Sequence, residues 1–111
     1  MTIEEIEKLI PKEFIIANHI IEIEIQEQVF DYNKTPLYGL WESALGRISI
    51  ARTIQTEKGP LVELSEEQIL NTFMHELMHC FMFFTGVQQD EMIAQTFANC
   101  LREYEVTKTF V

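Results

Sequence analysis

Two histidines and a glutamate lie within one short segment, His75-Glu76-Leu77-Met78-His79. On a helix, side chains four residues apart share a face with Cβ atoms about 5–6 Å apart, so both imidazoles can reach one metal ion. Zinc binds such nitrogen ligands at about 2.0–2.1 Å. Glu76 follows the first ligand and would lie beside the ion, where it can accept a proton from a water molecule that the ion activates. The segment predicts a divalent metal site, with zinc as the expected ion.

The side chains that surround this motif are almost all apolar: Phe73, Met74, Leu77, Met78, Cys80, Phe81, Met82, Phe83 and Phe84. A helix that is apolar on every side is expected to be largely buried. Burial of unpaired polar or charged groups costs several kcal/mol, and a bound metal ion would compensate the motif's two histidines and glutamate. The alternative is a metal-free core in which both histidines are neutral and hydrogen-bonded.

A catalytic zinc site needs a third protein ligand and one position left open for water. Glu91 and Asp90 are the candidates on the next predicted helix, and His19 is the only other histidine in the chain. Neighbouring residues of a helix point about 100° apart, so only one of the two acids should face the ion.

The residues that share a face with each acid favour Glu91. Its face carries Ala94, Gln95 and Ala98, whose slim side chains allow two helices to approach closely. The Asp90 face carries Ile93, Ala94 and Phe97, a set typical of core packing. We therefore predict His75, His79 and Glu91 as the metal ligands.

The elements expected around the site form one α+β domain that covers residues 1–111. Helical spacing of apolar residues predicts a helix over residues 2–10, and alternation of apolar and polar residues predicts a strand over 19–29. Residues 37–42 and 47–54 are expected as two further strands, joined across 43–46, in a small three-stranded antiparallel sheet.

Two helices are expected to follow a loop over residues 55–64. Ser65 and Gln68 form a capping-box pattern, and Gly86 is a typical helix end, so the motif helix is predicted over 66–85. The second helix is expected to begin at Asp90-Glu91 and to continue towards residue 107, because acids are favourable at the positive end of a helix dipole.

Charge and composition exclude several classes of partner. Eighteen acidic residues against eight basic ones give a net charge of −10, without the basic cluster that binding to nucleic acid or an anionic membrane requires. No apolar run approaches the roughly 18 residues of a membrane span. The acidic N-terminus does not resemble a secretory signal, and Cys80 and Cys100 are expected to be buried free thiols, so a cytoplasmic protein is predicted.

The motif and the segment after it resemble the small phage- and prophage-encoded HExxH proteins, and the chain looks like a reduced relative of the ImmA/IrrE metallopeptidases. In that family the third-ligand helix carries the pattern Glu-x-x-Ala-x-x-Phe-Ala, which stands here as Glu91, Ala94, Phe97 and Ala98. Tyr38-Gly39, followed by Ile48 and Ile50, resembles the tyrosine-glycine strand pair that precedes the helix in these phage proteins. The resemblance implies a zincin-like fold, with His75, His79 and Glu91 as ligands and Glu76 as base.

The resemblance implies a zinc metallopeptidase that acts on a protein or peptide. Tyr38 is a candidate for stabilising the oxyanion, although it is equally well explained as a strand aromatic with its hydroxyl in water. An extended substrate is expected to add to the edge of the sheet, with the strand over 47–54 as the expected edge. The alternative is a phage accessory protein that binds a host protein through a structural or vestigial metal site. The apolar run over residues 81–84 favours a homodimer through that end of the helix.

Overall fold

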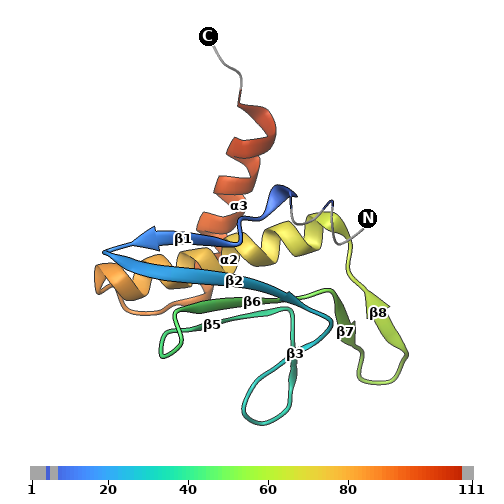
Figure 1. The fold of residues 1–111 in the computed structure, drawn as a ribbon. Helices are drawn as coiled ribbons and strands as arrows, with labels where there is room; N and C mark the ends of the chain where they lie inside the picture. Colours follow the sequence, from blue (N-terminus) through green and yellow to red (C-terminus); the bar gives the residue numbers. More distant parts are fainter. Residues whose placement is uncertain (1–4, 6–7, 109–111) are drawn as a thin grey trace.

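The computed structural model describes residue 5 and residues 8–108, and it is an α+β arrangement in which short strands precede two long helices (Figure 1). The helices are α2 (Glu66–Thr85) and α3 (Glu91–Thr107). The strands are β1 (Glu13–Ile16), β2 (His19–Gln26), β3 (Val29–Phe30), β4 (Pro36–Leu37), β5 (Gly39–Glu42), β6 (Arg47–Ala51), β7 (Thr53–Gln55) and β8 (Leu61–Glu63). Most of the helix predicted over residues 2–10 lies outside the described residues, although Glu5, Lys8 and Leu9 have helical conformation.

The main sheet has four strands in the order β1-β2-β6-β5, so the predicted three-stranded antiparallel sheet is wrong. β2 pairs with β6 in parallel, whereas β1 with β2 and β5 with β6 are antiparallel. After β2 the chain forms the small β3–β4 ladder. β5 then runs antiparallel to the direction of β2 but is not its neighbour, and β6 lies between the two. This connection separates β2 from β5 and makes the inserted strand parallel to β2.

The strand expected at the sheet edge is a central one. β6 lies between β2 and β5, and four of its five residues are buried. A strand with a neighbour on each side has no free main-chain edge that a peptide could pair with. The edge next to the motif helix is therefore β5, which contacts α2 directly.

α2 lies along the sheet and closes the core (Figure 1). Ile48 and Ile50 of β6 are fully buried in the same cluster as Ile69, Phe73 and Cys80 of α2. The prediction that this helix is buried almost all round is correct only in part, since Phe81 and Phe83 are 37% and 49% exposed. Their exposure leaves apolar surface at the C-terminal end of α2.

Capping residues set both ends of α2 and the start of α3, at the positions that were predicted. The Ser65 hydroxyl accepts from the Gln68 amide at 3.2 Å, and the Gln68 side chain accepts from the Ser65 amide at 2.8 Å. Gly86 ends α2 with φ +76°, a left-handed conformation that favours glycine. Asp90 caps α3, accepting from the Ile93 amide at 2.9 Å.

Two features of the strand region were not predicted. β1 forms an additional edge of the sheet, and the segment over 55–64, predicted as a loop, contains β8 paired with β7. All three residues of β8 are exposed, so its sequence has no alternation of apolar and polar residues that would indicate a strand.

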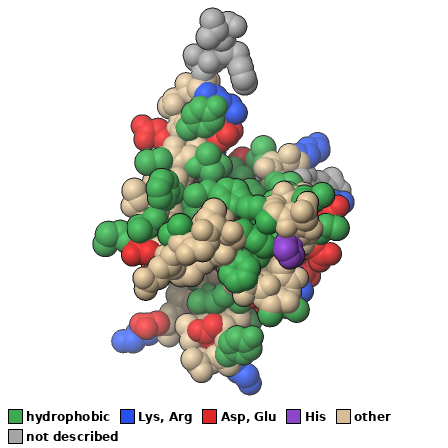
Figure 2. Space-filling view, turned by 90° about the vertical axis from the view of Figure 1, so that its left-hand side faces the viewer, with side chains coloured by type: hydrophobic (Ala, Val, Ile, Leu, Met, Phe, Trp, Pro, Cys, Tyr) green, Lys and Arg blue, Asp and Glu red, His purple; other side chains and the backbone are tan. Residues whose placement is uncertain are grey.

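α3 packs on α2 from Glu91 to Arg102, which is ion-paired with Glu67, and it projects away from the sheet (Figure 1). Apolar side chains gather along the projecting part and on the surface beneath it (Figure 2). Within the part of the chain that the structure describes, no helix has the length and apolar character needed to cross a membrane.

Candidate metal centre

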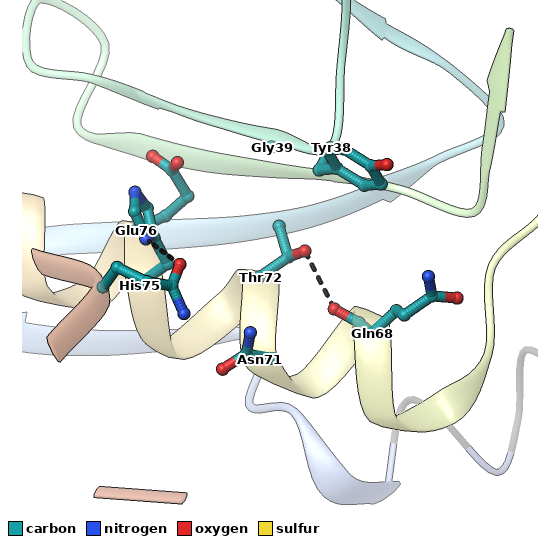
Figure 3. A pocket seen from close by; sticks show the side chains of 8 residues that line it. Tyr38, Gly39, Gln68, Asn71, Thr72, His75 and Glu76 are labelled. Atoms are coloured by element: carbon teal, nitrogen blue, oxygen red, sulfur yellow. Dashed lines mark hydrogen bonds between the residues drawn. The ribbon is translucent and has the colours of Figure 1, made fainter. Parts of the chain in front are cut away.

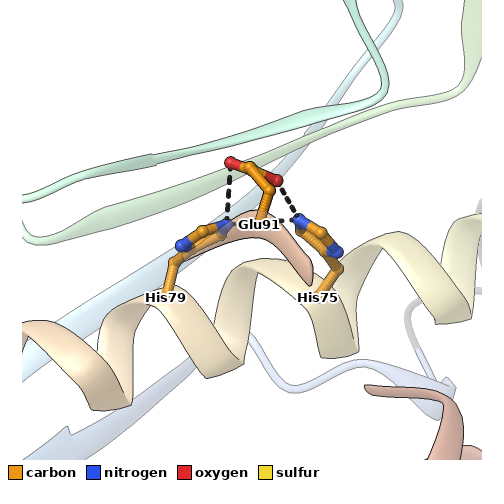
Figure 4. A group of neighbouring side chains, drawn as sticks. All are labelled: His75, His79 and Glu91. Carbon is orange, nitrogen blue, oxygen red and sulfur yellow. Dashed lines mark hydrogen bonds and ion pairs between the residues drawn. The ribbon is translucent and has the colours of Figure 1, made fainter. Parts of the chain in front are cut away.

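The predicted ligands His75, His79 and Glu91 lie together, as Figure 4 shows. The Glu91 carboxylate oxygens are 2.8 Å from His75 Nε2 and 3.0 Å from His79 Nε2, and the two Nε2 atoms are 3.2 Å apart. This group could hold a metal ion.

These three separations suit three ligands of a tetrahedrally coordinated zinc ion. Ligands at about 2.0–2.1 Å from zinc are about 3.3 Å from one another, a few tenths more than the distances found here. The histidine side chains are 16% and 10% exposed, whereas that of Glu91 is 82% exposed. The donor atoms therefore converge at the protein surface, and among the described residues the group contains no fourth His, Cys, Asp or Glu.

Glu91 reaches the histidines because the loop over residues 86–90 turns back and places the first residue of α3 beside the middle of α2. Ala94 and Ala98, which follow Glu91 on its helical face, are fully buried, and their small side chains allow the close helix contact that was predicted. Asp90 is engaged as the α3 N-cap, and it is not in the ligand group. Its predicted core neighbours are largely exposed instead, with Ile93 at 40% and Phe97 at 57%.

Neighbouring charges and hydrogen bonds shift the pKa values of Glu91 and His79. Partial burial raises the pKa of Glu91, but hydrogen bonds and charge from His75 and His79 outweigh burial and hold that pKa below its usual range. Burial lowers the pKa of His79, but hydrogen bonding to Gln89 and the charges of Glu76 and Glu91 raise it overall. A carboxylate between two imidazoles thus provides negative charge where a cation would bind.

Two glutamines whose role was not predicted contact the Nδ1 atoms of the rings: Gln95, predicted only as a slim residue on the Glu91 face, and Gln89, for which nothing was predicted. Gln89 Oε1 is 2.6 Å from His79 Nδ1, and Gln95 Oε1 is 2.8 Å from His75 Nδ1. Gln95 is one turn after Glu91 on the same face, which is a signal that was available. Gln89 is in the loop before α3, where no periodicity indicates its direction.

Glu76 is buried beside this group, with 8% of its surface exposed. Burial raises its pKa, and the nearby His79 and His75 oppose that rise without cancelling it. A carboxyl group with a raised pKa next to a candidate metal centre is suited to accepting and returning a proton.

Gly39 allows β5 to lie directly on α2 at Glu76. A Cβ atom at this position would be 2.6 Å from Thr72 Cγ2, 3.0 Å from the Ser49 carbonyl oxygen and 3.2 Å from Glu76 Cγ. Contacts this short are not compatible with a side chain, so glycine is required by close approach here.

A cavity of about 340 Å³ adjoins the centre between β5 and α2 (Figure 3). Its lining is mostly neutral: Tyr38, Gly39, Gln68, Asn71, Thr72, His75, Glu76 and Gln95. Tyr38 is 50% exposed, and its hydroxyl points away from His75 and Glu76. Among the described residues that line the cavity, Glu76 is therefore the only carboxylate, and the Tyr38 hydroxyl is directed away from it.

The remaining candidate donors lie elsewhere. His19 Nδ1 is 2.8 Å from the Ala17 carbonyl oxygen, and its ring centroid is 5.2 Å from that of Phe84. Cys80 is fully buried, and burial raises the pKa of its thiol to about 11. Both cysteines are free, but Cys100 is exposed, so the prediction that it is buried is wrong.

Comparison with known proteins adds no family to these observations. No protein-family model matches the chain, and no curated protein or solved structure is significantly similar to it. The resemblance to ImmA/IrrE metallopeptidases thus stays a prediction that rests on the motif residues.

Proposed function

We propose that this protein is a zinc-dependent hydrolase that cleaves peptide bonds with Glu76 as general base. The observation that supports this most directly is the group formed by two largely buried histidines, His75 and His79, and the exposed Glu91, with the buried Glu76 beside it. Structural zinc sites are closed by four protein ligands, whereas catalytic sites have three and leave a position open. The three-residue group fits the second kind.

The donor set also favours zinc over harder cations. Two imidazole nitrogens and one carboxylate suit zinc, whereas magnesium and calcium prefer oxygen ligands. When bound, the ion would polarise the substrate carbonyl and lower the pKa of water. His75, His79 and Glu91 would hold it, and the negative charge of Glu91 would partly balance it.

Glu76 would accept a proton from the attacking water and return it to the departing amine. Its raised pKa, caused by burial, suits both halves of that transfer. General acid–base catalysis of this kind contributes about 10²–10⁴-fold to a rate. Tyr38 would act as an oxyanion donor only after its side chain turns, because its hydroxyl points away from Glu76.

β5 would receive an extended substrate. It is an edge strand of the main sheet, and its first residue, Gly39, and the preceding Tyr38 line the cavity beside the centre. An edge strand offers main-chain hydrogen bonds to a peptide without requiring particular side chains. A peptide along β5 would therefore pass Glu76.

The decisive experiment compares Glu76→Gln with the parent protein on a set of unstructured peptides. We expect stoichiometric zinc in both proteins and hydrolysis only in the parent, because the amide preserves shape but accepts no proton. Glu66→Gln, an exchange of the same type in the exposed first turn of α2, is the matched control and should cleave normally. Equal rates for Glu76→Gln and the parent would exclude Glu76 as the base.

A second candidate is an accessory protein that binds a host protein and does not use its metal site for catalysis. It is favoured by apolar side chains on α3, where Ile93, Phe97 and Tyr104 are 40%, 57% and 59% exposed. The predicted homodimer would instead use Phe81 and Phe83, which are 37% and 49% exposed at the C-terminal end of α2. Phe97→Glu would weaken partner binding and Phe81→Glu would weaken self-association under this proposal. Both variants should keep zinc binding intact, as sedimentation and metal analysis would show.

We further propose a cytoplasmic location. Both cysteines are free thiols, and one of them is exposed, which suits a reducing compartment.

A further inference from the structure

The outer nitrogens of the two candidate ligand histidines have partners of the same kind. His79 Nδ1 contacts Gln89 Oε1 at 2.6 Å, and His75 Nδ1 contacts Gln95 Oε1 at 2.8 Å. In both rings the other nitrogen, Nε2, faces Glu91. The Nδ1 atom of each imidazole, on the side of the ring away from Glu91, is therefore hydrogen-bonded to a side-chain amide.

The orientation of the Gln89 amide follows from its second contact. Gln89 Nε2 is 3.0 Å from the main-chain carbonyl oxygen of His79, which can only accept a hydrogen bond. The NH2 group must lie on that side, so the amide oxygen faces the ring. Because an amide oxygen also only accepts, His79 Nδ1 must carry a proton. In the neutral ring, which is the form that binds a metal, Nε2 then has its lone pair on the side where Glu91 lies, whereas in the protonated ring Nε2–H donates to Glu91.

Gln95 forms the corresponding arrangement on α3. Its Oε1 faces His75 Nδ1, and its Nε2 donates to Asn99 Oδ1 at 2.7 Å, one turn further along the helix. The hydrogen bond to Asn99 restrains the amide from its other end. With Gln95 Oε1 directed at His75 Nδ1, His75 also presents Nε2 to the shared centre.

Gln89 has a further effect through its place in the chain. It is directly before Asp90, the α3 N-cap, and two residues before Glu91. Its bonds to the ring and main chain of His79 tie the loop between the helices to the end of α2. One side chain thus restrains two of the three candidate ligands.

We propose that Gln89 and Gln95 are positioning residues of the metal centre, each accepting the Nδ1 proton of one histidine so that Nε2 is directed at the ion. The proposal rests on the proposed function in so far as the centre must hold zinc. Partners of this kind set the tautomer and direction of a ligand, and their loss typically costs about 10–100-fold in metal affinity.

Gln89 is the better position for a test, because Gln95 also lines the substrate cavity. Gln89→Ala removes both hydrogen bonds. Gln89→Glu keeps an acceptor for His79 Nδ1 but loses the donor to the His79 carbonyl. Gln88→Ala is the matched control, since Gln88 is an exposed neighbour in the same loop. Zinc affinity is measured by competition with a chelator, the ligand field by the visible spectrum of the cobalt form, and stability of the metal-free proteins by urea unfolding.

We expect Gln89→Ala to bind zinc about 10–100-fold more weakly with a changed cobalt spectrum. Gln89→Glu should recover most of the affinity, although both variants lose the tie to the His79 carbonyl and should be similarly destabilised without metal. Gln88→Ala should match the parent in every measurement. Gln95→Ala is expected to weaken zinc binding as Gln89→Ala does.

Two results would overturn the positioning role alone. One is unchanged zinc affinity in Gln89→Ala or Gln95→Ala while the parent binds zinc. The other is equal weakening in Gln89→Ala and Gln89→Glu, which would show that Gln89 only tethers the loop. A parent protein that binds no zinc would overturn the proposed function as well.

Discussion

Substitution of Gly39 by alanine tests the packing that brings β5 to Glu76. The added Cβ would be 2.6 Å from Thr72 Cγ2 and 3.0 Å from the Ser49 carbonyl oxygen. Favourable contact between carbon atoms lies at about 3.5–4.0 Å, so the methyl contact is about 1 Å too short. The Ser49 oxygen belongs to the main chain of β6, and no change of rotamer can move it. Overpacking of this kind costs about 1–3 kcal/mol of unfolding free energy.

The variant Thr72→Ser shows how much of the destabilisation by Gly39→Ala comes from the contact with the Thr72 methyl group. It removes Cγ2 and keeps the hydroxyl that donates to the Gln68 carbonyl oxygen at 2.8 Å. In this background Gly39→Ala should cost about 1 kcal/mol less than in the parent, a coupling within the usual range for residues in contact. The contacts with Ser49 and with Glu76 Cγ, at 3.2 Å, remain and keep the rescue partial.

Urea unfolding followed by fluorescence is the assay, because the single tryptophan, Trp41, is in β5 itself. Gly86→Ala serves as the control. Gly86 has φ +76° and nothing within 4 Å of an added Cβ, so its cost of about 1–2 kcal/mol comes from the backbone alone. Thr72→Ser should leave that cost unchanged. Equal costs of Gly39→Ala in both backgrounds, or no cost at all, would refute the close packing of β5 on α2.

Four further predictions concern the thiols, the helix caps and the third metal ligand. Burial raises the pKa of Cys80 to about 11 from 9.0, so at pH 8 a thiol reagent should label Cys100 in the folded protein and Cys80 only after unfolding. Because the folded state holds the Cys80 proton more tightly, its contribution to stability should be complete below about pH 9 and decline towards pH 11, as urea midpoints across this range would show. Ser65→Ala removes one half of the α2 capping box and should cost about 1 kcal/mol in the same assay, with an unchanged midpoint as the contrary result. Asp90→Ala should cost a similar amount but retain stoichiometric zinc, whereas Glu91→Gln should lose it; the opposite pattern in metal analysis would assign the ligand to Asp90.

The sequence by itself determined the motif helix and the candidate ligands. The limits of α2 follow from the Ser65 capping box and Gly86, which are contacts within a few residues. Helical period places His75 and His79 on one face, and the small residues Ala94 and Ala98 identify the face that brings Glu91 to them. Such features are local, so a pattern of neighbouring residues contains them.

Only the tertiary structure decided how the strands are ordered and what surrounds the ligands. Alternation in β2 indicates which side chains share a face, but it does not indicate the neighbouring strand, so the parallel pairing with β6 and the edge position of β5 were missed. The contact of Gln89 with His79 joins a loop to a helix across ten residues, and the fit of Gly39 against Thr72 joins a strand to a helix. Distances between separate elements set these contacts, and no periodicity within one element encodes them.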